Sequence, residues 1–444
     1  MKKRTISRRN FLKTTAVLLA PTIVSAKALG LEPHSIPASE RVTMGMIGVG
    51  KQGRLNTLGF LLFPEAQIVA ACDIVENHAN MAAKMVNEFY GNTDCRAYWD
   101  FRELLARPDI DAVFIGTTAH WHAYLTINAM KHGKDVYCEK PETHSIRDGI
   151  LMREAARRYE RVFSGGSQRV WNDYNLFHKI IRAGLIGDVL EGYQNSGDGS
   201  YNAYFPGEPI PPGVHWDMFV GPAPYRPYSP AYIGTEGAGV ADFCSGSLGL
   251  GAHSIGGVMF AMQLQHTGPV KIIPACLSEN GRLTLVFKNG QKIIQGAATG
   301  SVQGVRKRLP GSIGGLISFL GTEGPLTEWD IQNERYPVPD IDIPNYRGPI
   351  LRPEVAANLH YDSPLYASVG KTSIHGDFLH CCKTRETPFR NIEACHRVCT
   401  AGHLGHIATY FRREIHFDPV TERIIGDPEA AVRMDVPRRA QWEI

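Results

Sequence analysis

Three glycines near position 50 have the spacing of a turn that binds phosphate groups. They lie in Gly48-Val49-Gly50-Lys51-Gln52-Gly53, and an acidic residue, Asp73, follows twenty positions after the last of them. The first glycine permits a tight turn, the second lets the backbone approach a pyrophosphate, and the third lets a helix pack closely on a strand. A carboxylate at Asp73 would accept hydrogen bonds from ribose hydroxyls and would repel a 2′-phosphate. The pattern therefore predicts dinucleotide binding, with NAD preferred over NADP.

A second candidate for chemistry is Lys140, in Glu139-Lys140-Pro141. It follows the apolar run Asp135-Val136-Tyr137-Cys138, which is typical of a buried strand. Ligands of doubly wound sheets bind beyond the carboxyl ends of the strands, so this lysine is expected at the nicotinamide end of the crevice. An ammonium group there can polarise or protonate a substrate oxygen. We therefore predict a catalytic Lys140; the alternative is a solvated lysine before a turn.

The elements that would position these residues alternate through the first half of the chain. Strand-like runs occupy residues 41–47, 68–73, 111–115 and 135–138, and helical patterns occupy 55–63, 100–106 and the segment that His120 opens. Strands that alternate with helices predict an α/β Rossmann domain, with a doubly wound parallel sheet. We place this domain at residues 41–164.

The pattern changes near residue 165. Strand-like runs at 189–194, 271–296 and 316–324 include an Asn289-Gly290 hairpin signal, and helical patterns cover 175–183, 375–382 and 392–411. Several strands of this kind predict an α+β C-terminal domain with an open, mostly antiparallel sheet. We place it at residues 165–444 and expect it to bind the substrate.

These motifs resemble those of the Gfo/Idh/MocA family of sugar-acting oxidoreductases, over nearly all of the chain that follows the leader. The resemblance rests on the glycine turn, Asp73, His122, the run Asp109-Ile110-Asp111-Ala112-Val113 and the run Gly133-Lys134-Asp135-Val136-Tyr137-Cys138-Glu139-Lys140-Pro141. It implies that Lys140 lies beside nicotinamide and substrate, and that hydride passes between a ring alcohol, such as C3 of a glycoside, and NAD. The residues expected to bind the cofactor are Gly48, Gly50, Lys51, Gln52, Gly53, Asp73, Thr117, His122, Glu139, Lys140 and Gln168.

His253 is the candidate for the base that takes the hydroxyl proton; the alternative is a core histidine. In the family, the corresponding helix commonly carries Asp-x-x-x-His. This chain has the histidine, but Gly249 stands in place of the aspartate and Gly256 at a second position that is commonly acidic. Either Lys140 and His253 suffice, or a nearby acid such as Asp242 substitutes, or the reaction is not a plain dehydrogenation.

Candidate substrate contacts lie in two further segments. Gln168 and Arg169, where the second domain begins, would hydrogen-bond sugar hydroxyls unless they belong to a surface loop. Trp216 lies in a segment rich in proline, glycine and aromatic residues, and would form either a platform for a sugar ring or part of the core. The expected partner is a small sugar or glycoside, and the resemblance also implies a homo-oligomer, a dimer or tetramer.

The N-terminus carries Ser7-Arg8-Arg9-Asn10-Phe11-Leu12-Lys13, which resembles a twin-arginine export signal. The apolar stretch at 16–24 is interrupted by Pro21 and is too short to span a bilayer of roughly 30 Å. We therefore expect a signal peptide at 1–26, a linker at 27–40, export of the folded protein by the twin-arginine machinery and a periplasmic location. The alternative is an uncleaved N-terminal anchor.

Charge and cysteine content exclude several classes of function. The chain has 47 basic and 44 acidic residues, but six of the basic ones lie in the leader, so the remainder carries −3 instead of +3. This balance argues against nucleic acid or anionic membrane as a partner. The nine cysteines form no C-x-x-C motif, so we expect mostly buried thiols. His403 and His406 lack a carboxylate at zinc-site spacing, so no metal is expected.

Export also restricts how the cofactor turns over, because free NAD is not expected outside the inner membrane. A second sugar would be reduced in a closed cycle, or oxidation would be transient as in the NAD-dependent glycosidases of the same superfamily, or an outside acceptor would reoxidise NADH. The motif Glu139-Lys140-Pro141 resembles the oxidoreductase branch more than the glycosidase branch. A non-catalytic sugar sensor on the same scaffold is a further alternative.

Overall fold

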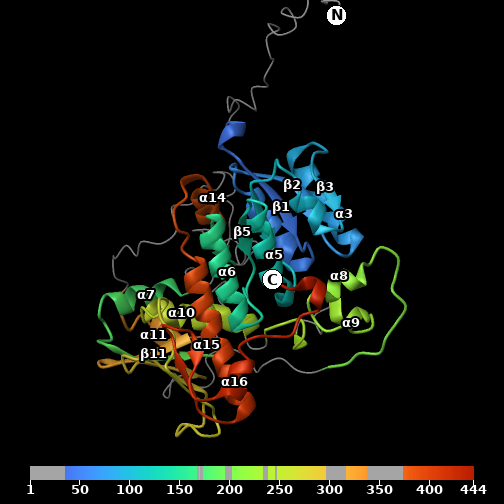
Figure 1. Cartoon of the computed structure of the whole chain (residues 1–444). Coiled ribbons are helices and arrows are strands. Elements are labelled where there is room, and N and C mark those ends of the chain that lie inside the picture. Colours follow the sequence, from blue (N-terminus) through green and yellow to red (C-terminus); the bar gives the residue numbers. More distant parts are fainter. Residues whose placement is uncertain are drawn as a thin grey trace, which may run out of the picture. The chain divides into compact units, whose positions relative to one another are not determined.

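The computed structural model describes residues 36–167, 170, 174–195, 203–233, 239–245, 248–296, 317–337 and 374–444. The predicted signal peptide, Gln168 and Arg169 lie outside the described residues. The chain divides into two compact units, 1–41 and 42–444, and in the first the described residues include a short 3₁₀ helix, Ala38–Glu40. Both sheets belong to the second unit (Figure 1).

The first sheet has six strands in the order β3-β2-β1-β4-β5-β6, and every pair is parallel. The strands are β1 (Val42–Ile47), β2 (Ala66–Cys72), β3 (Arg96–Tyr98), β4 (Ala112–Ile115), β5 (Asp135–Cys138) and β6 (Phe163–Gly165). The central strands β4 and β5 are buried along their whole length, as continuous apolar runs predict for a sheet covered on both faces. The prediction of a doubly wound parallel sheet is confirmed.

Helices connect successive strands of this sheet. They are α2 (Lys51–Leu61), α3 (Glu76–Tyr90), α4 (Phe101–Leu105), α5 (Ala119–Lys131) and α6 (Ile146–Tyr159). Helix α2 begins at Lys51, earlier than predicted, because the backbone turns directly into the helix at Gly50. Helix α6 begins at a capping box in which Ser145 and Asp148 bond each other's backbone N–H groups.

The second sheet has eight strands in the order β12-β11-β7-β10-β9-β8-β13-β14. They are β7 (Val189–Gln194), β8 (Lys271–Ile273), β9 (Thr284–Val286), β10 (Lys292–Gln295), β11 (Ile317–Gly321), β12 (Gly324–Leu326), β13 (Ile415–Asp418) and β14 (Arg423–Ile424). Among the strands that the structure describes in this sheet, only β10 and β7 pair in parallel, which confirms the mostly antiparallel prediction. Gly290 has φ of 87° in the β9–β10 turn, where the hairpin was expected.

The helices of this half are α7 (Asn175–Arg182), α8 (Trp216–Val220), α9 (Pro230–Ile233), α10 (Leu248–Ala261), α11 (Glu328–Gln332), α14 (Ile374–Thr384), α15 (Ile392–Phe411) and α16 (Pro428–Val432), followed by a 3₁₀ helix, Ala440–Trp442. Helices α7, α10 and α15 bury apolar side chains against the second sheet in one large core. Helix α15 also packs on α6 of the first half (Figure 1). The two halves are therefore joined by a continuous helical contact.

All nine cysteines lie in the described residues and none forms a disulfide bond; most are buried, as expected. None of the helices in the described ranges combines the length and apolar character needed to cross a membrane.

Candidate functional site

The glycine turn forms a cradle between β1 and α2. Gly48 has φ of +81°, and a Cβ there would lie 2.6 Å from the backbone nitrogen of Thr117. A Cβ on Gly53 would collide with the carbonyl oxygen of Gly48, so the helix can approach only without a side chain. At Gly50, in contrast, a Cβ would meet no atom within 4 Å. The turn is thus tightly packed at Gly48 and Gly53 and open at Gly50. This arrangement fits a pyrophosphate at the N-terminus of α2.

Asp73 lies one residue beyond β2 and joins the glycine turn to the next loop. Its Oδ2 accepts a hydrogen bond from Val49 N–H at 2.9 Å, and its Oδ1 accepts one from Val75 N–H at 2.9 Å. His78 Nδ1 lies 3.4 Å from Oδ1. The carboxylate is therefore held at the carboxyl end of β2, where an adenosine ribose would lie. Together with the glycine cradle, this donor and acceptor set fits an NAD-type dinucleotide.

His122 links the ends of β4 and β5. Its Nδ1 lies 2.8 Å from Pro141 O and its Nε2 lies 3.0 Å from Thr117 O. Burial lowers the pKa of His122, so the ring is neutral and donates one hydrogen bond. The ring is only 1% exposed. His122 therefore holds the loop after β5 against the loop after β4.

Lys140 begins the loop after β5, as predicted, and is half-buried. The preceding residue, Glu139, is buried and folds back so that its Oε2 accepts Lys140 N–H at 3.0 Å. Burial raises the pKa of Glu139, and the charge of Lys140 opposes that effect. The Lys140–Pro141 peptide bond is cis. The backbone of the predicted catalytic lysine is thus fixed by its own neighbour.

A hydrogen-bonded chain from distant elements supports this turn, and the sequence analysis missed it. Asn56 Nδ2, on α2, donates to Glu139 Oε1 at 2.9 Å. Asn56 Oδ1 lies 3.0 Å from His375 Nε2, on α14. Burial lowers the pKa of His375 to about 3, so the neutral ring is the donor and sets the direction of the Asn56 amide. No local pattern marks these residues, because 319 positions separate them.

Glu142 is a second group that the sequence analysis missed. It lies two residues after Lys140 and is fully buried. Its Oε1 lies 3.9 Å from the guanidinium of Arg390 and accepts a hydrogen bond from Ser167 Oγ at 3.5 Å. Cys399 Sγ, on α15, donates to Oε2 at 3.4 Å. Glu142 therefore joins the lysine loop to the second half of the chain.

His253 lies in α10 and is 3% exposed. A Cβ on Gly256, one helical turn further on, would lie 3.6 Å from the guanidinium of Arg390. The arginine that pairs with Glu142 thus borders the position that is commonly acidic in the family. Ser245, before α10, donates through its hydroxyl to Thr143 O. The segment that precedes α10 and the loop that carries Lys140 are therefore in contact.

Asp242 and Trp216 occupy a separate cluster. Asp242 Oδ2 accepts a hydrogen bond from Arg226 Nε at 2.7 Å. Trp216 is 2% exposed, its ring stacks on Phe219 at 4.8 Å, and its Nε1–H donates to Arg226 O. An indole without an accessible face cannot form a platform for a sugar, so the core alternative replaces the predicted platform. One oxygen of Asp242 is occupied by the ion pair.

The remaining predicted cofactor residues of the turn, Lys51 and Gln52, are exposed in the first turn of α2. Gln52 also accepts a hydrogen bond from Asn56 Nδ2 through its backbone oxygen, at 3.2 Å. The turn is therefore tied to the same asparagine that holds Glu139.

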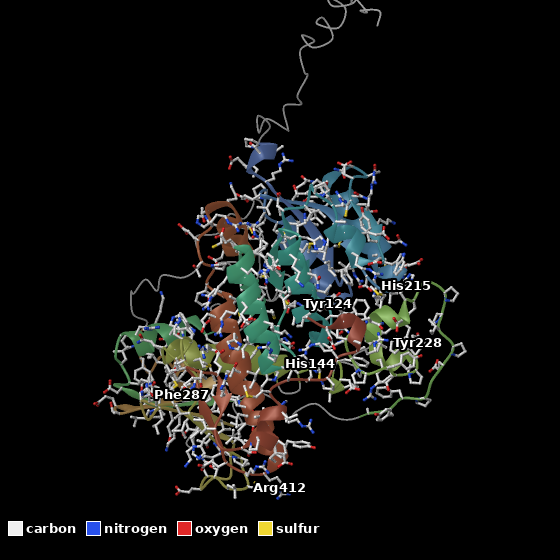
Figure 2. All side chains as sticks on the ribbon, viewed as in Figure 1. Tyr124, His144, His215, Tyr228, Phe287 and Arg412 are labelled. Atoms are coloured by element: carbon white, nitrogen blue, oxygen red, sulfur yellow. The ribbon has the colours of Figure 1, made fainter. Side chains whose placement is uncertain are left out.

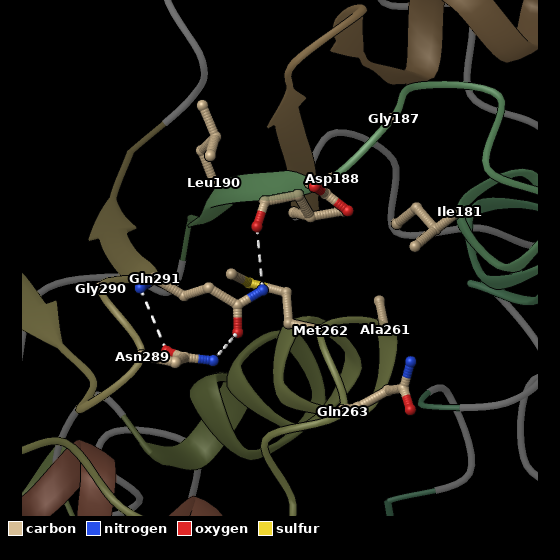
Figure 3. Close-up of a pocket in the computed structure, with 11 residues that line it drawn as sticks. Ile181, Gly187, Asp188, Leu190, Ala261, Met262, Gln263, Asn289, Gly290 and Gln291 are labelled. Carbon is tan, nitrogen blue, oxygen red and sulfur yellow. Dashed lines mark hydrogen bonds between the residues drawn. The ribbon is translucent and has the colours of Figure 1, made fainter.

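A pocket of about 610 Å³ lies elsewhere, at the start of β7 and the end of α10 (Figure 3). It is lined by Ile181, Gly187, Asp188, Val189, Leu190, Ala261, Met262, Gln263, Asn289, Gly290 and Gln291. Its amides bond each other and the backbone: Asn289 Nδ2 donates to Gln291 Oε1 at 2.7 Å, and Gln291 Nε2 donates to Val189 O at 2.9 Å. None of the predicted site residues lines it, so the candidate site remains at the first sheet.

Comparison with curated proteins finds relatives that match part of the chain. A protein named "Glycosyl hydrolase family 109 protein 2" from Shewanella sp. (strain ANA-3) is 30% identical over 211 residues, 42% of this chain and 44% of that protein. An "Alpha-N-acetylgalactosaminidase" from Shewanella oneidensis is 26% identical over 210 residues, 42% of this chain and 45% of that protein. The chain thus matches less than half the length of these relatives.

Solved structures share the fold. Scyllo-inositol dehydrogenase from Lactobacillus casei, with bound NAD(H) and scyllo-inositol, is 17% identical with a TM-score of 0.53, covering 85% of this chain and 99% of that one. Aldose-aldose oxidoreductase from Caulobacter crescentus is 15% identical with a TM-score of 0.52, covering 85% of this chain and 100% of that one.

Family models match both halves of the chain. A model described as an oxidoreductase family with an NAD-binding Rossmann fold matches residues 42–167, and the model of its C-terminal α/β domain matches residues 179–300 and 364–444. Together they cover the first sheet, six of the eight strands of the second sheet, and the elements that carry Asp73, Lys140 and His253. The chain therefore belongs to the Gfo/Idh/MocA oxidoreductase family.

Proposed function

We propose that this protein is an NAD-dependent oxidoreductase that moves hydride between a ring secondary alcohol of a sugar or glycoside and a bound NAD. The observation that carries the proposal is the meeting of two loops at the first sheet. The glycine cradle with Asp73 fits the dinucleotide, and the loop after β5 presents Lys140, fixed by Glu139 and Asn56. Inositol and aldose oxidoreductases with the same fold support a polyhydroxylated substrate.

In this proposal, NAD held by the glycine cradle and Asp73 would supply the hydride acceptor. The protein's own contribution is to position the alcohol and to move its proton. Lys140 holds and polarises the substrate oxygen, and His253 is the second group that can take the proton. Asn56 and His122 hold the lysine loop from two sides. Asp73 selects NAD over NADP because it leaves no room, and no favourable charge, for a 2′-phosphate.

A redox-assisted glycosidase is the second candidate, and the relatives named as glycosyl hydrolases favour it. Oxidation at C3 acidifies the neighbouring C–H bond, so elimination of the aglycone, addition of water to the resulting double bond and return of the hydride to C3 would complete a hydrolysis. The absence of an aspartate at Gly249 agrees with either chemistry. The two candidates share the cofactor site and the same first step.

We further propose export by the twin-arginine route, with cleavage near residue 26 and a periplasmic, oligomeric protein whose domains divide near residue 165. The support is Arg8-Arg9 and the short apolar stretch that follows. Replacing both arginines by lysine should leave the precursor in the cytoplasmic fraction; unchanged export would rule this route out. Light scattering should give a dimer or tetramer, and a monomer would contradict the oligomer.

The variant Lys140→Ala tests whether the site is catalytic. It should abolish turnover by a factor of at least about 10² while NAD and sugar binding are retained, because a positioned proton donor contributes roughly that much. Binding is measured by calorimetry and turnover by the reduced-nicotinamide absorbance. Equal turnover in the variant and the wild type would remove Lys140 from the mechanism, and no turnover in either protein would favour the sensor alternative.

A further inference from the structure

One segment of the second half runs along the ends of the first-sheet strands. We call it the strap, and it comprises the described residues 211–233 and 239–245, with α8 and α9 (Figure 1). Its aromatic core is Trp216, Phe219, Tyr228, Tyr232 and Phe243. Its hydrogen bonds and ring contacts with the first half that are given below fall just beyond the carboxyl ends of β2, β3, β4 and β5. That edge is where a dinucleotide lies in a doubly wound sheet.

The strap begins beside the adenosine end of the groove. Gly213 O accepts a hydrogen bond from Glu76 N–H at 2.9 Å, and His215 N–H donates to Ile74 O at 2.9 Å. The His215 ring stacks on Trp99 with centroids 3.9 Å apart and an interplanar angle of 10°. Figure 2 labels His215 on this segment. The His215 Nε2 lies 3.0 Å from Glu76 Oε1. These partners directly follow Asp73 and β3, so the strap borders the place of the ribose.

The middle of the strap is fixed to the start of α5, beyond β4. His120 Nε2 and Trp121 Nε1 each lie 3.0 Å from Phe219 O. Burial lowers the pKa of His120 to about 3, so the neutral ring can donate to this oxygen. From the C-terminus, Arg439 Nε donates to Gly221 O at 2.7 Å and its NH1 pairs with Asp217 at 2.6 Å. This part of the strap is therefore anchored from both sides.

The strap ends at the lysine loop, beyond β5. His144 Nε2 lies 2.8 Å from Ala241 O. The Ser245 hydroxyl donates to Thr143 O. These residues follow Lys140 by three and four positions, which places this end beside the nicotinamide half of the groove.

We infer that the strap retains the dinucleotide in its groove and that the cofactor leaves only when the strap detaches. The inference rests on the proposed function, because it takes the ligand to be NAD. It follows from the three contact regions of the strap, which lie beyond the carboxyl ends of β2 and β3, of β4 and of β5, at the edge of the sheet where a dinucleotide would lie. A retained cofactor suits an enzyme that works where free NAD is absent.

The test is the release rate of NAD from the full chain. The protein is loaded with NAD and diluted into cofactor-free buffer, and the NAD that remains bound is measured over time. His215→Ala removes the stack on Trp99 and the hydrogen bond to Glu76 at one end, and Arg439→Gln removes the anchor in the middle. Each should speed release by about tenfold, since such contacts correspond to roughly that factor in an equilibrium constant.

Two matched variants serve as controls. His416 pairs with Glu414 at 2.8 Å and Arg413 pairs with Asp427 at 2.7 Å, both away from the strap. His416→Ala and Arg413→Gln should release NAD at the wild-type rate. In addition, His215→Ala should weaken ADP-ribose binding as strongly as NAD binding, because it acts at the adenosine end.

The possible outcomes distinguish a failure of the strap inference from a failure of the proposed function. Wild-type release from His215→Ala and Arg439→Gln, with melting temperatures unchanged, would overturn the strap. If His215→Ala unfolds, His215→Phe keeps the stack and loses only the hydrogen bond to Glu76. Release of NAD at the wild-type rate from His215→Phe and from Arg439→Gln would then overturn the strap. A wild-type protein that takes up no NAD would overturn the proposed function itself.

Discussion

At the scale of single residues, substitutions at Gly50 and Gly53 of the turn should have different effects. Gly50 has a negative φ of −60° and open space where a Cβ would lie, whereas a Cβ on Gly53 would strike the Gly48 carbonyl. Gly50→Ala should leave the melting temperature unchanged and weaken NAD binding by about tenfold or more, because the methyl group would occupy the pyrophosphate's approach.

Gly53→Ala should instead destabilise the fold by about 1–3 kcal/mol, because the helix must move away from the strand. Thermal melting without cofactor and NAD titration together distinguish the two effects. Equal melting temperatures for both variants would contradict the tight packing beneath the turn.

Residue types and their spacing were enough to predict the glycine cradle, but not the residues that hold the lysine loop. The glycine spacing, Asp73 and Lys140 were readable because a strand, a turn and a helix are contiguous in the chain. Asn56, His375 and Glu142 were not, since their roles arise only when α2, α14 and α15 meet the loop after β5. Trp216 shows the converse: its type suggested a platform, and only its burial by Phe219 placed it in the core.

At the scale of elements, an ion-pair cluster joins α6, α15 and the turn before β14. Glu422 Oε1 lies 2.9 Å from His396 Nε2 and 2.8 Å from the guanidinium of Arg397, and its Oε2 pairs with Arg153. Burial acts to raise the pKa of Glu422, but the bonds from His396 and Arg153 outweigh it and lower the pKa to about 2. The cluster fixes the edge of the second sheet to α6 and α15, the two helices that pack on each other between the halves.

Because the folded pKa of Glu422 lies below its unfolded value near 4.5, its contribution to stability is present above that pH and is lost as pH falls toward 2. Glu422→Gln should lower the free energy of unfolding at neutral pH by up to about 3 kcal/mol and flatten the acid limb. Denaturant titrations from pH 7 downward measure this. Glu429→Gln, at a far more exposed acid paired with Arg413, is the control and should change little.

Element types and order were predicted well where periodicity was strong, and poorly where elements were short. The strands β4 and β5 and the long helix α15 lie at their predicted positions. The three-residue strands β3 and β6 were not predicted, because three residues carry no usable period. The parallel β7–β10 pair was not predicted either, because strand neighbours are set by the tertiary fold.

At the scale of the whole molecule, the site is assembled from both halves of the chain. The cofactor cradle belongs to the first sheet, while His375, Arg390 and the strap come from the second half. A reaction that depends on both therefore requires the complete unit of residues 42–444. Under the proposed function, the same arrangement would let a cofactor domain of ordinary topology hold NAD for many turnovers.

The most direct test of this account is an absorbance spectrum of protein purified without added cofactor, recorded before and after a panel of glycosides. The account predicts bound NAD and, with one class of sugar, a reduced-nicotinamide band that Lys140→Ala does not develop. Release of the aglycone without a lasting band would favour the glycosidase. Protein that carries no NAD, takes up none when it is supplied and shows no reduced band with any sugar would contradict the account.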